Sequence, residues 1–247
     1  MKTLIIIPSR MSATRLPGKP LLKINGLSIN GLSIISHVFK RAEKANIGEV
    51  IVAAEDQEIA DDVKSNGGNA ILTSQKHKTG TDRIYEAFNL LKRNDIDYIM
   101  NVQGDEPDID INDIKVLDTK MKSNNSEIGT LAAKIQNQSM YDDEDVVKVK
   151  IEESFNKNLF PFAKNFMRKT KDKINVFHHM GIYCYKISAL KKFISFDQSK
   201  NEIENRLEQL RALDNNIKIN VALANKSPIG VDTKEDYIDI KKIMKYK

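Results

Sequence analysis

The stretch that decides the fold is residues 5–20, which read IIIPSRMSATRLPGKP. It opens with an apolar, β-branched run that has the character of a buried strand. Three cations, Arg10, Arg15 and Lys19, follow within a short loop that contains no carboxylate. In an open α/β sheet, a loop between a strand and a helix presents backbone N–H groups to phosphate. The stretch therefore predicts a buried first strand and, directly behind it, a site for an anion.

The chemistry of the three side chains indicates which anion. Each arginine offers a planar fork for phosphate oxygens and the lysine adds a point charge, so the set suits a polyphosphate better than a single carboxylate. The loop is not a Walker loop, because no Gly-Lys-Ser/Thr closes it, and its one glycine excludes the dinucleotide fingerprint. A basic surface loop that binds nothing is the alternative interpretation.

Alternating strand and helix patterns follow this stretch and predict an α/β fold. Apolar runs typical of buried strands occupy residues 3–8, 50–54, 69–73 and 97–102. Apolar residues recur at helical spacing in the segments 34–42, 59–63 and 84–91. Such alternation predicts a mostly parallel central sheet flanked by helices on both faces, with ligands beyond the carboxyl ends of the strands.

The second half of the chain predicts a change of architecture. Strands are expected at 128–135, 146–151 and 180–186 without regular helical partners, so approximately 130–185 is interpreted as a smaller mixed β extension. Helices at 188–195 and 201–214, a strand at 217–224 and a helix at 233–245 are expected to follow. No linker rich in Pro, Gly or Ser divides the chain, and residues 1–247 are interpreted as a single domain.

The tandem repeat NGLSI-NGLSI at residues 25–34 is too short to be a structural repeat of the solenoid kind. One copy is interpreted as an insertion of five residues ahead of a helix. Five residues are about 1.4 helical turns, so they would rotate a continuous helix out of phase with its core face. The surplus is therefore expected to form a longer surface loop.

Composition bounds the class of protein. The chain has 247 residues, a formal net charge of +5 and one cysteine, Cys184, which excludes an internal disulfide framework. Its lysines are spread along the whole chain, with no basic tract interleaved with aromatics, so no nucleic-acid partner is expected. No segment has the length of a membrane span, and residues 4–7 are too short for a signal peptide core, so a cytoplasmic protein without a membrane partner is expected.

Two aspartates stand where strands are expected to end. Asp105 lies in NVQGDEP at 101–107, where Gly104 is expected to let the backbone turn sharply, and Asp232 lies in IGVDT at 229–233. Carboxylates so placed are ligands that magnesium prefers, with substrate phosphates completing its shell. A turn or helix cap is the alternative for Asp105, and an N-cap of the last helix is the alternative for Asp232. Together with the basic loop they predict metal, triphosphate and cations in one cleft.

Six motifs occur in an order and spacing that resembles the 3-deoxy-manno-octulosonate cytidylyltransferase (CMP-Kdo synthetase) family. They are RMSATRLPGKPL at 10–21, KTGTDR at 78–83, NVQGDEP at 101–107, HHMGIYCYK at 178–186, RLEQLRAL at 206–213 and GVDTKED at 230–236. The resemblance implies a Rossmann-like nucleotidyltransferase fold and a homodimer joined through the mixed β region. It implies a Mg²⁺-dependent transfer of CMP from CTP to 3-deoxy-manno-octulosonate (Kdo) for lipopolysaccharide biosynthesis, with release of pyrophosphate.

The same resemblance implies roles for individual residues. The triphosphate would be held by Arg10, Arg15 and Lys19, and the nucleotide would be framed by Thr79, Gly80, Thr81 and Arg83. Asp105 and Asp232 would bind metal and, with Lys19, form the catalytic set. The sugar-acid pocket would be lined by Gln103, His179, Tyr183, Glu208 and Gln209. Without the resemblance, His179 would read as a structural histidine, and Glu208 and Gln209 as helix surface.

The chain departs from the family pattern at a few positions. Phe162-Ala163-Lys164 stands where the family commonly has Phe-Ser-Arg, which removes a hydroxyl and replaces a planar fork with a point charge. Glu55 and Asn205 also replace acidic residues common in the family. Two alternatives therefore stand beside the CMP-Kdo synthetase interpretation: a cytidylyltransferase for another acid sugar, such as an 8-amino Kdo analogue or a sialic acid, and a non-catalytic nucleotide-binding protein.

Overall fold

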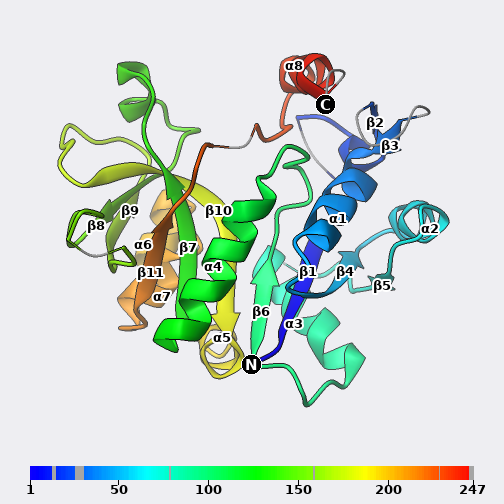
Figure 1. Ribbon diagram of the computed structural model, residues 1–247, viewed down its shortest axis with the longest axis horizontal. Helices are drawn as coiled ribbons and strands as arrows, with labels where there is room; N and C mark the ends of the chain where they lie inside the picture. The colour runs from blue at the N-terminus through cyan, green and yellow to red at the C-terminus, as the bar shows by residue number, and fades with distance from the viewer. Residues whose placement is uncertain (13–14, 26–30, 78, 158, 228, 245–247) are drawn as a thin grey trace. The chain divides into compact units, whose positions relative to one another are not determined.

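The computed structural model describes residues 1–12, 15–25, 31–77, 79–157, 159–227 and 229–244 (Figure 1). The chain separates into two compact units. The parallel-sheet unit comprises residues 2–114 and 228–247, and the mixed-sheet unit comprises residues 115–227 with Met1. The mixed-sheet unit extends beyond the predicted extension of 130–185 at both ends. The single-domain interpretation stays a prediction.

The parallel-sheet unit is built on four parallel strands in the order β6-β1-β4-β5 (Figure 1). Their bounds are β1 (Thr3–Ser9), β4 (Gly48–Ala54), β5 (Ala70–Leu72) and β6 (Tyr98–Asn101). The connecting helices are α1 (Ile34–Lys44), α2 (Gln57–Ser65) and α3 (Gly80–Leu91). All four predicted strands and all three predicted helices of this half are confirmed, because each carries the apolar period that its burial requires.

The order of these strands creates a place for a ligand. The chain runs from β1 outward through β4 to β5, then returns to pair β6 with the other edge of β1. Right-handed crossovers put α1 and α2 on one face of the sheet and α3 on the other, because the direction of travel reverses. Between β1 and β6 the connections leave in opposite directions, and ligands of open α/β sheets bind at such a switch point.

The sequence predicted that the basic loop lies between a strand and a helix. In the structure, other elements separate the loop from that helix. The loop first forms a single 3₁₀ turn, η1 (Lys19–Leu21), and then a hairpin of β2 (Lys23–Ile24) and β3 (Leu32–Ser33). Ser33 caps α1 by accepting a hydrogen bond from the Ser36 N–H at 3.1 Å, so the helix begins where the second NGLSI copy was expected to begin it. Residues 26–30, which include most of the first copy, lie outside the described residues.

The mixed-sheet unit holds five strands and several short helices. The strands are β7 (Ile128–Ala133), β8 (Lys148–Ile151), β9 (Ala163–Met167), β10 (Val176–Lys186) and β11 (Ile219–Leu223). Strand β7 pairs with β11 in parallel and with β10 antiparallel, and β8 pairs antiparallel with β10 and β9. The helical pieces are η2 (Gln138–Tyr141), α5 (Ile187–Ile194), α6 (Lys200–Asn205) and α7 (Leu210–Asp214).

Three features of the second half differ from the sequence prediction. The single helix expected at 201–214 is wrong: α6 ends at Arg206, whose φ of 53° is left-handed, and a turn precedes α7. Strand β9 was not predicted, because its burial does not alternate. Helix α4 (Ile111–Asn124) was also missed, although its buried residues Ile114, Leu117 and Met121 recur at helical spacing. The last helix is confirmed as α8 (Lys234–Met244).

None of the described helices combines the length and the apolar character needed to cross a bilayer.

The pairing of β2 with β3 makes a specific prediction for the tandem repeat. Ile24 pairs with Leu32, so removing residues 25–29 would join the two strands through Asn30-Gly31 alone. Asn-Gly is the strongest two-residue hairpin sequence, and shortening the loop lowers its closure entropy by roughly 1 kcal/mol. We expect the shortened protein to fold and to melt at the same or a higher temperature in a thermal-unfolding scan. Deleting residues 30–34 gives the same sequence, so the register is unambiguous. An insoluble product would show that the extra copy is integral to the structure.

Candidate functional site

The candidate site is a pocket of about 380 Å³ in the parallel-sheet unit. Residues that follow β1 and β6, namely Arg10 and Gln103, open into it, which places it at the predicted switch point. Nine residues predicted from the sequence line this one pocket: Arg10, Arg15, Lys19, Thr79, Gly80, Arg83, Gln103, Asp105 and Asp232. They come from four separate segments of the chain, so the fold brings them together.

Local backbone geometry aims Lys19 into the pocket. Gly18 caps the 3₁₀ turn with a left-handed φ of 72°, a conformation that glycine adopts without strain. Pro20 follows and fixes the first turn, and the Lys19 N–H donates to the Leu16 carbonyl at 3.2 Å. The Met11 N–H donates to the Asp56 carboxylate at 2.8 Å, which holds the start of the loop. The LPGKP sequence therefore builds a rigid platform for one ammonium group.

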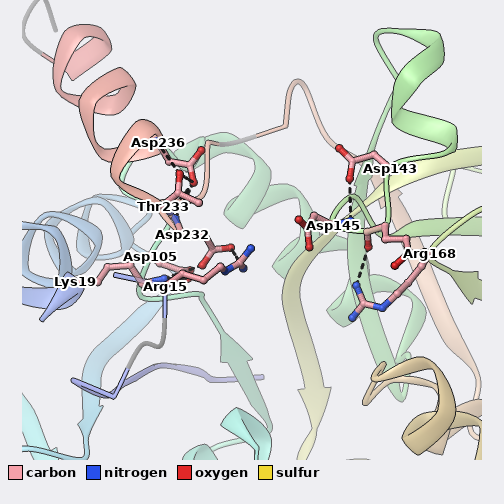
Figure 2. A network of polar contacts seen from close by, with 10 residues as sticks. Arg15, Lys19, Asp105, Asp143, Asp145, Arg168, Asp232, Thr233 and Asp236 are labelled. Atoms are coloured by element: carbon pink, nitrogen blue, oxygen red, sulfur yellow. Dashed lines mark hydrogen bonds and ion pairs between the residues drawn. The ribbon is translucent and has the colours of Figure 1, made fainter. Parts of the chain in front are cut away.

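The Lys19 ammonium lies between two carboxylates (Figure 2). Its Nζ donates to Asp105 Oδ2 at 2.8 Å and to Asp232 Oδ1 at 3.0 Å. Burial lowers the pKa of Lys19, but the two aspartates outweigh burial and raise it above its usual value, so the side chain is charged at neutral pH. Arg15 Nη2 donates to Asp232 Oδ2 at 2.9 Å, in a pair exposed enough to contribute little stability.

Packing and capping place Asp232 beside Asp105. The Val231 N–H donates to the Asp105 carbonyl at 2.9 Å, and the Val231 side chain is buried in a cluster with Ile24, Ile34, Ile240 and Met244. The alternative that Asp232 caps the last helix is wrong. The Thr233 hydroxyl accepts from the Asp236 N–H at 3.2 Å, and Asp236 accepts from the Thr233 N–H at 2.8 Å, so these two residues form the cap (Figure 2). The Asp232 carboxylate is thereby left to face the pocket.

The backbone turns at Gly104 as predicted, since the Glu106 N–H donates to the Gln103 carbonyl at 3.5 Å, and packing gives a second reason for the glycine. Its φ is not left-handed, but a Cβ there would approach the Pro8 carbonyl oxygen to 2.9 Å and Ile35 Cδ1 to 3.1 Å. The glycine therefore allows the loop after β6 to lie close against the end of β1. This close approach sets Asp105 at the rim of the same pocket as Arg10.

A third carboxyl group lies next to the aspartates. Burial, followed by the charges of Asp105 and Asp232, raises the pKa of Glu106 to about 8. Its Oε2 is buried and has no hydrogen-bond partner among the described residues. Burial and the two neighbouring carboxylates therefore favour the neutral form of Glu106 at neutral pH. No cluster of three or more metal-ligating side chains occurs in the described parts of the chain, so a cation here would share Asp105 and Asp232 with substrate oxygens.

The residues predicted to frame the nucleotide have partners of their own. Thr79 caps α3 by accepting from the Asp82 N–H at 3.2 Å. Arg83 is buried and makes an ion pair with Glu55, and its Nη1 donates to Thr73 Oγ1 at 2.8 Å. Glu55 thus accepts the guanidinium in place of the aspartate common in the family.

Sequence reasoning missed His77, which also lines the pocket. Its Nε2 contacts the Glu86 carboxylate. Burial raises the pKa of Glu86, but the contacts with His77, the Ser74 N–H and Arg83 together outweigh burial and lower this pKa. The only signal in the sequence was that His77 stands two residues before Thr79.

The other four predicted residues, His179, Tyr183, Glu208 and Gln209, belong to the mixed-sheet unit. The His179 and Tyr183 rings lie 5.4 Å apart. The pKa of Tyr183 is raised well above its usual value by burial, then by Tyr185 and Glu208, which shows that Glu208 is near it. Gln209 precedes α7 directly. The structure therefore brings His179, Tyr183 and Glu208 together within this unit.

A buried ion pair fixes the turn that carries Glu208 and Gln209. Arg211 donates to both oxygens of Glu202, at 2.7 and 2.6 Å, and each side chain is 4% exposed. The guanidinium also lies over the Phe193 ring, 4.7 Å from its centroid. Burial raises the pKa of Glu202, but the Arg211 hydrogen bonds outweigh it and the pKa is lowered. The pair joins α6 to α7 across the turn that the sequence did not predict.

Lys164 lies apart from these residues in a second cavity of the mixed-sheet unit, of about 390 Å³. Its neighbours there include Asn201, Asn205 and Asp214. The described structure gives no contact that explains the exchange of Ser-Arg for Ala163-Lys164.

A parallel sheet with a basic loop and two aspartates that converge on one pocket fits a nucleotidyltransferase of the Rossmann-like kind, although Asp232 lies just before α8 and not at the end of a strand as predicted. The chain is similar to the solved structure of CMP:2-keto-3-deoxy-manno-octonic acid synthetase complexed with CTP, with a TM-score of 0.89 and 31% identity over 100% of this chain and 99% of that one. UDP-glucose pyrophosphorylase complexed with UDP-glucose, 12% identical over 100% of this chain and 99% of that one, has a TM-score of 0.69 and shows the fold alone.

Sequence comparison identifies the family more closely. Residues 4–219 match the cytidylyltransferase family. The 3-deoxy-manno-octulosonate cytidylyltransferase of Thermodesulfovibrio yellowstonii is 40% identical over 96% of this chain and 95% of its own length. That of Nitrobacter winogradskyi is 40% identical over 95% of this chain and 91% of its own. The chain belongs to the 3-deoxy-manno-octulosonate cytidylyltransferase family, which confirms the predicted resemblance.

The Glu202–Arg211 pair makes a prediction about stability. Arg211→Met leaves the buried Glu202 carboxylate without its charged partner, so we expect the free energy of unfolding in urea to fall by about 3–5 kcal/mol. The double variant Glu202→Leu/Arg211→Met removes both charges and should recover most of that loss. Lys242→Met, which breaks an exposed pair with Asp239, is the control and should change the free energy by less than about 1 kcal/mol. A small loss in Arg211→Met would contradict the structural role of the pair.

Proposed function

We propose that the chain transfers CMP from CTP to the anomeric hydroxyl of Kdo, giving CMP-Kdo and pyrophosphate for lipopolysaccharide biosynthesis. The observation that carries the proposal is the Lys19 ammonium between Asp105 and Asp232, beside Arg15, in a pocket at the carboxyl ends of β1 and β6. Relatives named for this reaction, and a similar structure complexed with CTP, support the choice of substrates.

The basic loop suits the departing group of this reaction. The sugar hydroxyl attacks the α-phosphorus, the bond from that phosphorus to the bridging oxygen breaks, and negative charge grows on pyrophosphate. Lys19 carries three N–H donors, and its two aspartates accept two of them, so one remains for a phosphate oxygen. Arg10 and Arg15 line the same pocket and would add charge where it develops.

Asp105 and Asp232 would hold Mg²⁺. The oxygens of two carboxylates that converge on one pocket suit a hard cation at this place. Such an ion, when bound, supplies charge that lowers the pKa of the attacking hydroxyl and clamps the α-phosphate. The two aspartates would hold the ion and orient it, and the reaction needs no side-chain nucleophile.

Further parts of the proposal follow the family resemblance. His179, Tyr183, Glu208 and Gln209 would contact the sugar acid. A homodimer is proposed through the mixed-sheet unit, where Leu159 and Ile174 are 70% and 74% exposed, an exposure that supports a protein contact. A cytoplasmic location is part of the same proposal.

A pyrophosphate-release assay with CTP tests the function. The purified chain is supplied with Kdo, an 8-amino Kdo analogue or a sialic acid, and release is expected to be fastest with Kdo and to require Mg²⁺. Faster release with another sugar would move the assignment to that sugar. CTP binding without release from any of them would support the non-catalytic alternative.

The aspartates make the first functional prediction. Asp105→Asn and Asp232→Asn each remove a charge at nearly constant volume, so turnover should fall by about 10²- to 10³-fold, while the thermal midpoint changes little. Steady-state kinetics at saturating Mg²⁺ measure the loss. Near-normal Mg²⁺-dependent activity in either variant would remove that residue from the metal site.

The basic loop makes the second functional prediction. Arg15→Ala and Lys19→Ala should each weaken CTP binding by about 10- to 100-fold, because each removes a charge-assisted hydrogen bond, and should affect sugar binding far less. Lys191→Ala, on the exposed side of α5, is the control for the loss of one positive charge. Titration calorimetry that gives unchanged CTP affinity in both loop variants would rule out the triphosphate role.

A further inference from the structure

A threonine on β7 contacts the histidine that the resemblance assigns to the sugar pocket. Thr130 is fully buried, and its Oγ1 lies 3.1 Å from His179 Nε2 on β10. The same oxygen lies 2.7 Å from the Ile182 carbonyl and 3.1 Å from the Met180 carbonyl. These contacts fall where the register of β10 against β7 shifts, between Met180 and Tyr183. Thr130 therefore sits at a strand irregularity, a feature that re-aims side chains.

The contacts decide where the single hydroxyl hydrogen of Thr130 goes. A carbonyl oxygen accepts a hydrogen bond and cannot donate one. If the Thr130 hydroxyl hydrogen pointed to His179, both carbonyl oxygens would face the Thr130 oxygen with no hydrogen between them. The hydrogen must therefore point to one of the two carbonyls. The 2.7 Å contact with Ile182 is the shorter one. With its hydrogen so placed, Thr130 Oγ1 can only accept from His179, and His179 Nε2 must carry a hydrogen.

The environment of His179 keeps its ring neutral and fixed. Burial, followed by the neighbouring His178, lowers the pKa of His179 to about 3. The ring packs edge-on against Phe166, with centroids 5.0 Å apart, and lies 5.4 Å from the Tyr183 ring. A neutral ring with hydrogen on Nε2 has a bare Nδ1, which accepts hydrogen bonds and cannot donate them.

We propose that Thr130 is a positioning residue that holds His179 in the Nε2–H tautomer, so that Nδ1 accepts a hydrogen bond from a hydroxyl group of the sugar acid. His179 would then read a hydroxyl and not the carboxylate, because a bare nitrogen repels a carboxylate oxygen. The sugar part of this inference rests on the proposed function, whereas the tautomer does not depend on turnover.

The wild-type protein provides the first test. A long-range ¹H–¹⁵N spectrum of the histidine rings at neutral pH distinguishes the two tautomers, and His179→Gln identifies the His179 signals. The Nε2–H pattern is expected. An Nδ1–H pattern or a charged ring at His179 would overturn the inference. This result tests the inference even if a variant fails to fold, because the tautomer of His179 is a property of the unmodified chain.

Two variants of Thr130 provide the second test. Thr130→Val removes the acceptor, so the His179 signals should show the Nδ1–H form, and KM for Kdo should rise about 5- to 20-fold while KM for CTP changes less than about twofold. Thr130→Ser keeps the hydroxyl and should restore the tautomer and most of the Kdo affinity. Thr3→Val, at another buried threonine, is the control for a lost core hydroxyl and should leave KM for Kdo unchanged.

The outcomes separate this inference from the proposed function. If the wild-type chain forms no CMP-Kdo, the proposed function is wrong. This result is known before any variant is made. An active wild-type chain whose Thr130→Val variant keeps both the Nε2–H pattern and the Kdo KM would overturn the role of Thr130 alone.

Discussion

The pocket of the parallel-sheet unit depends on one interaction, the Lys19 ammonium shared by Asp105 and Asp232, which are 86 and 213 residues away in sequence. Three local features place these side chains. They are the left-handed φ of Gly18, the close approach of Gly104 to β1 and the Thr233–Asp236 cap. A cation between two carboxylates outweighs the desolvation of Lys19 and keeps it charged. Two carboxylates that converge in this way are also the ligands that the proposed metal ion would need.

The mixed-sheet unit solves a different problem, which is to hold neutral polar groups in fixed orientations. Thr130, His179 and Tyr183 are almost fully buried, and the pKa of His179 is far below neutrality. The Glu202–Arg211 pair fixes the turn before α7 without adding net charge. A sugar acid carries many hydroxyl groups, and a pocket of neutral acceptors and donors with fixed hydrogens can distinguish them better than mobile charges can. The candidate site of the parallel-sheet unit thus relies on charged groups, whereas Thr130 and His179 of the mixed-sheet unit are neutral groups with fixed hydrogen-bond directions.

Much of the parallel-sheet unit could be predicted from the sequence, because its strands and helices follow the apolar periods of buried elements. Nine predicted site residues line one pocket, partly for a similar reason: β1 and β6 deliver Arg10 and Asp105 to one edge of the sheet, whereas the packing of Val231 brings Asp232 there. The break at Arg206 and the strand β9 could not be predicted, since the first needs a left-handed residue other than glycine and the second lacks alternating burial. The second reason for Gly104 and the contacts of Thr130 and His77 depend on packing between distant segments, which no local pattern encodes.

The most direct measurement of the central claim is the anomalous scattering of Mn²⁺, used in place of Mg²⁺, in crystals of the protein grown with CTP. The account predicts one strong peak that is bonded to carboxylate oxygens of both Asp105 and Asp232 and to phosphate oxygens of the nucleotide. CTP bound in the pocket with no peak at these two aspartates, or with the metal held by other residues, would contradict it.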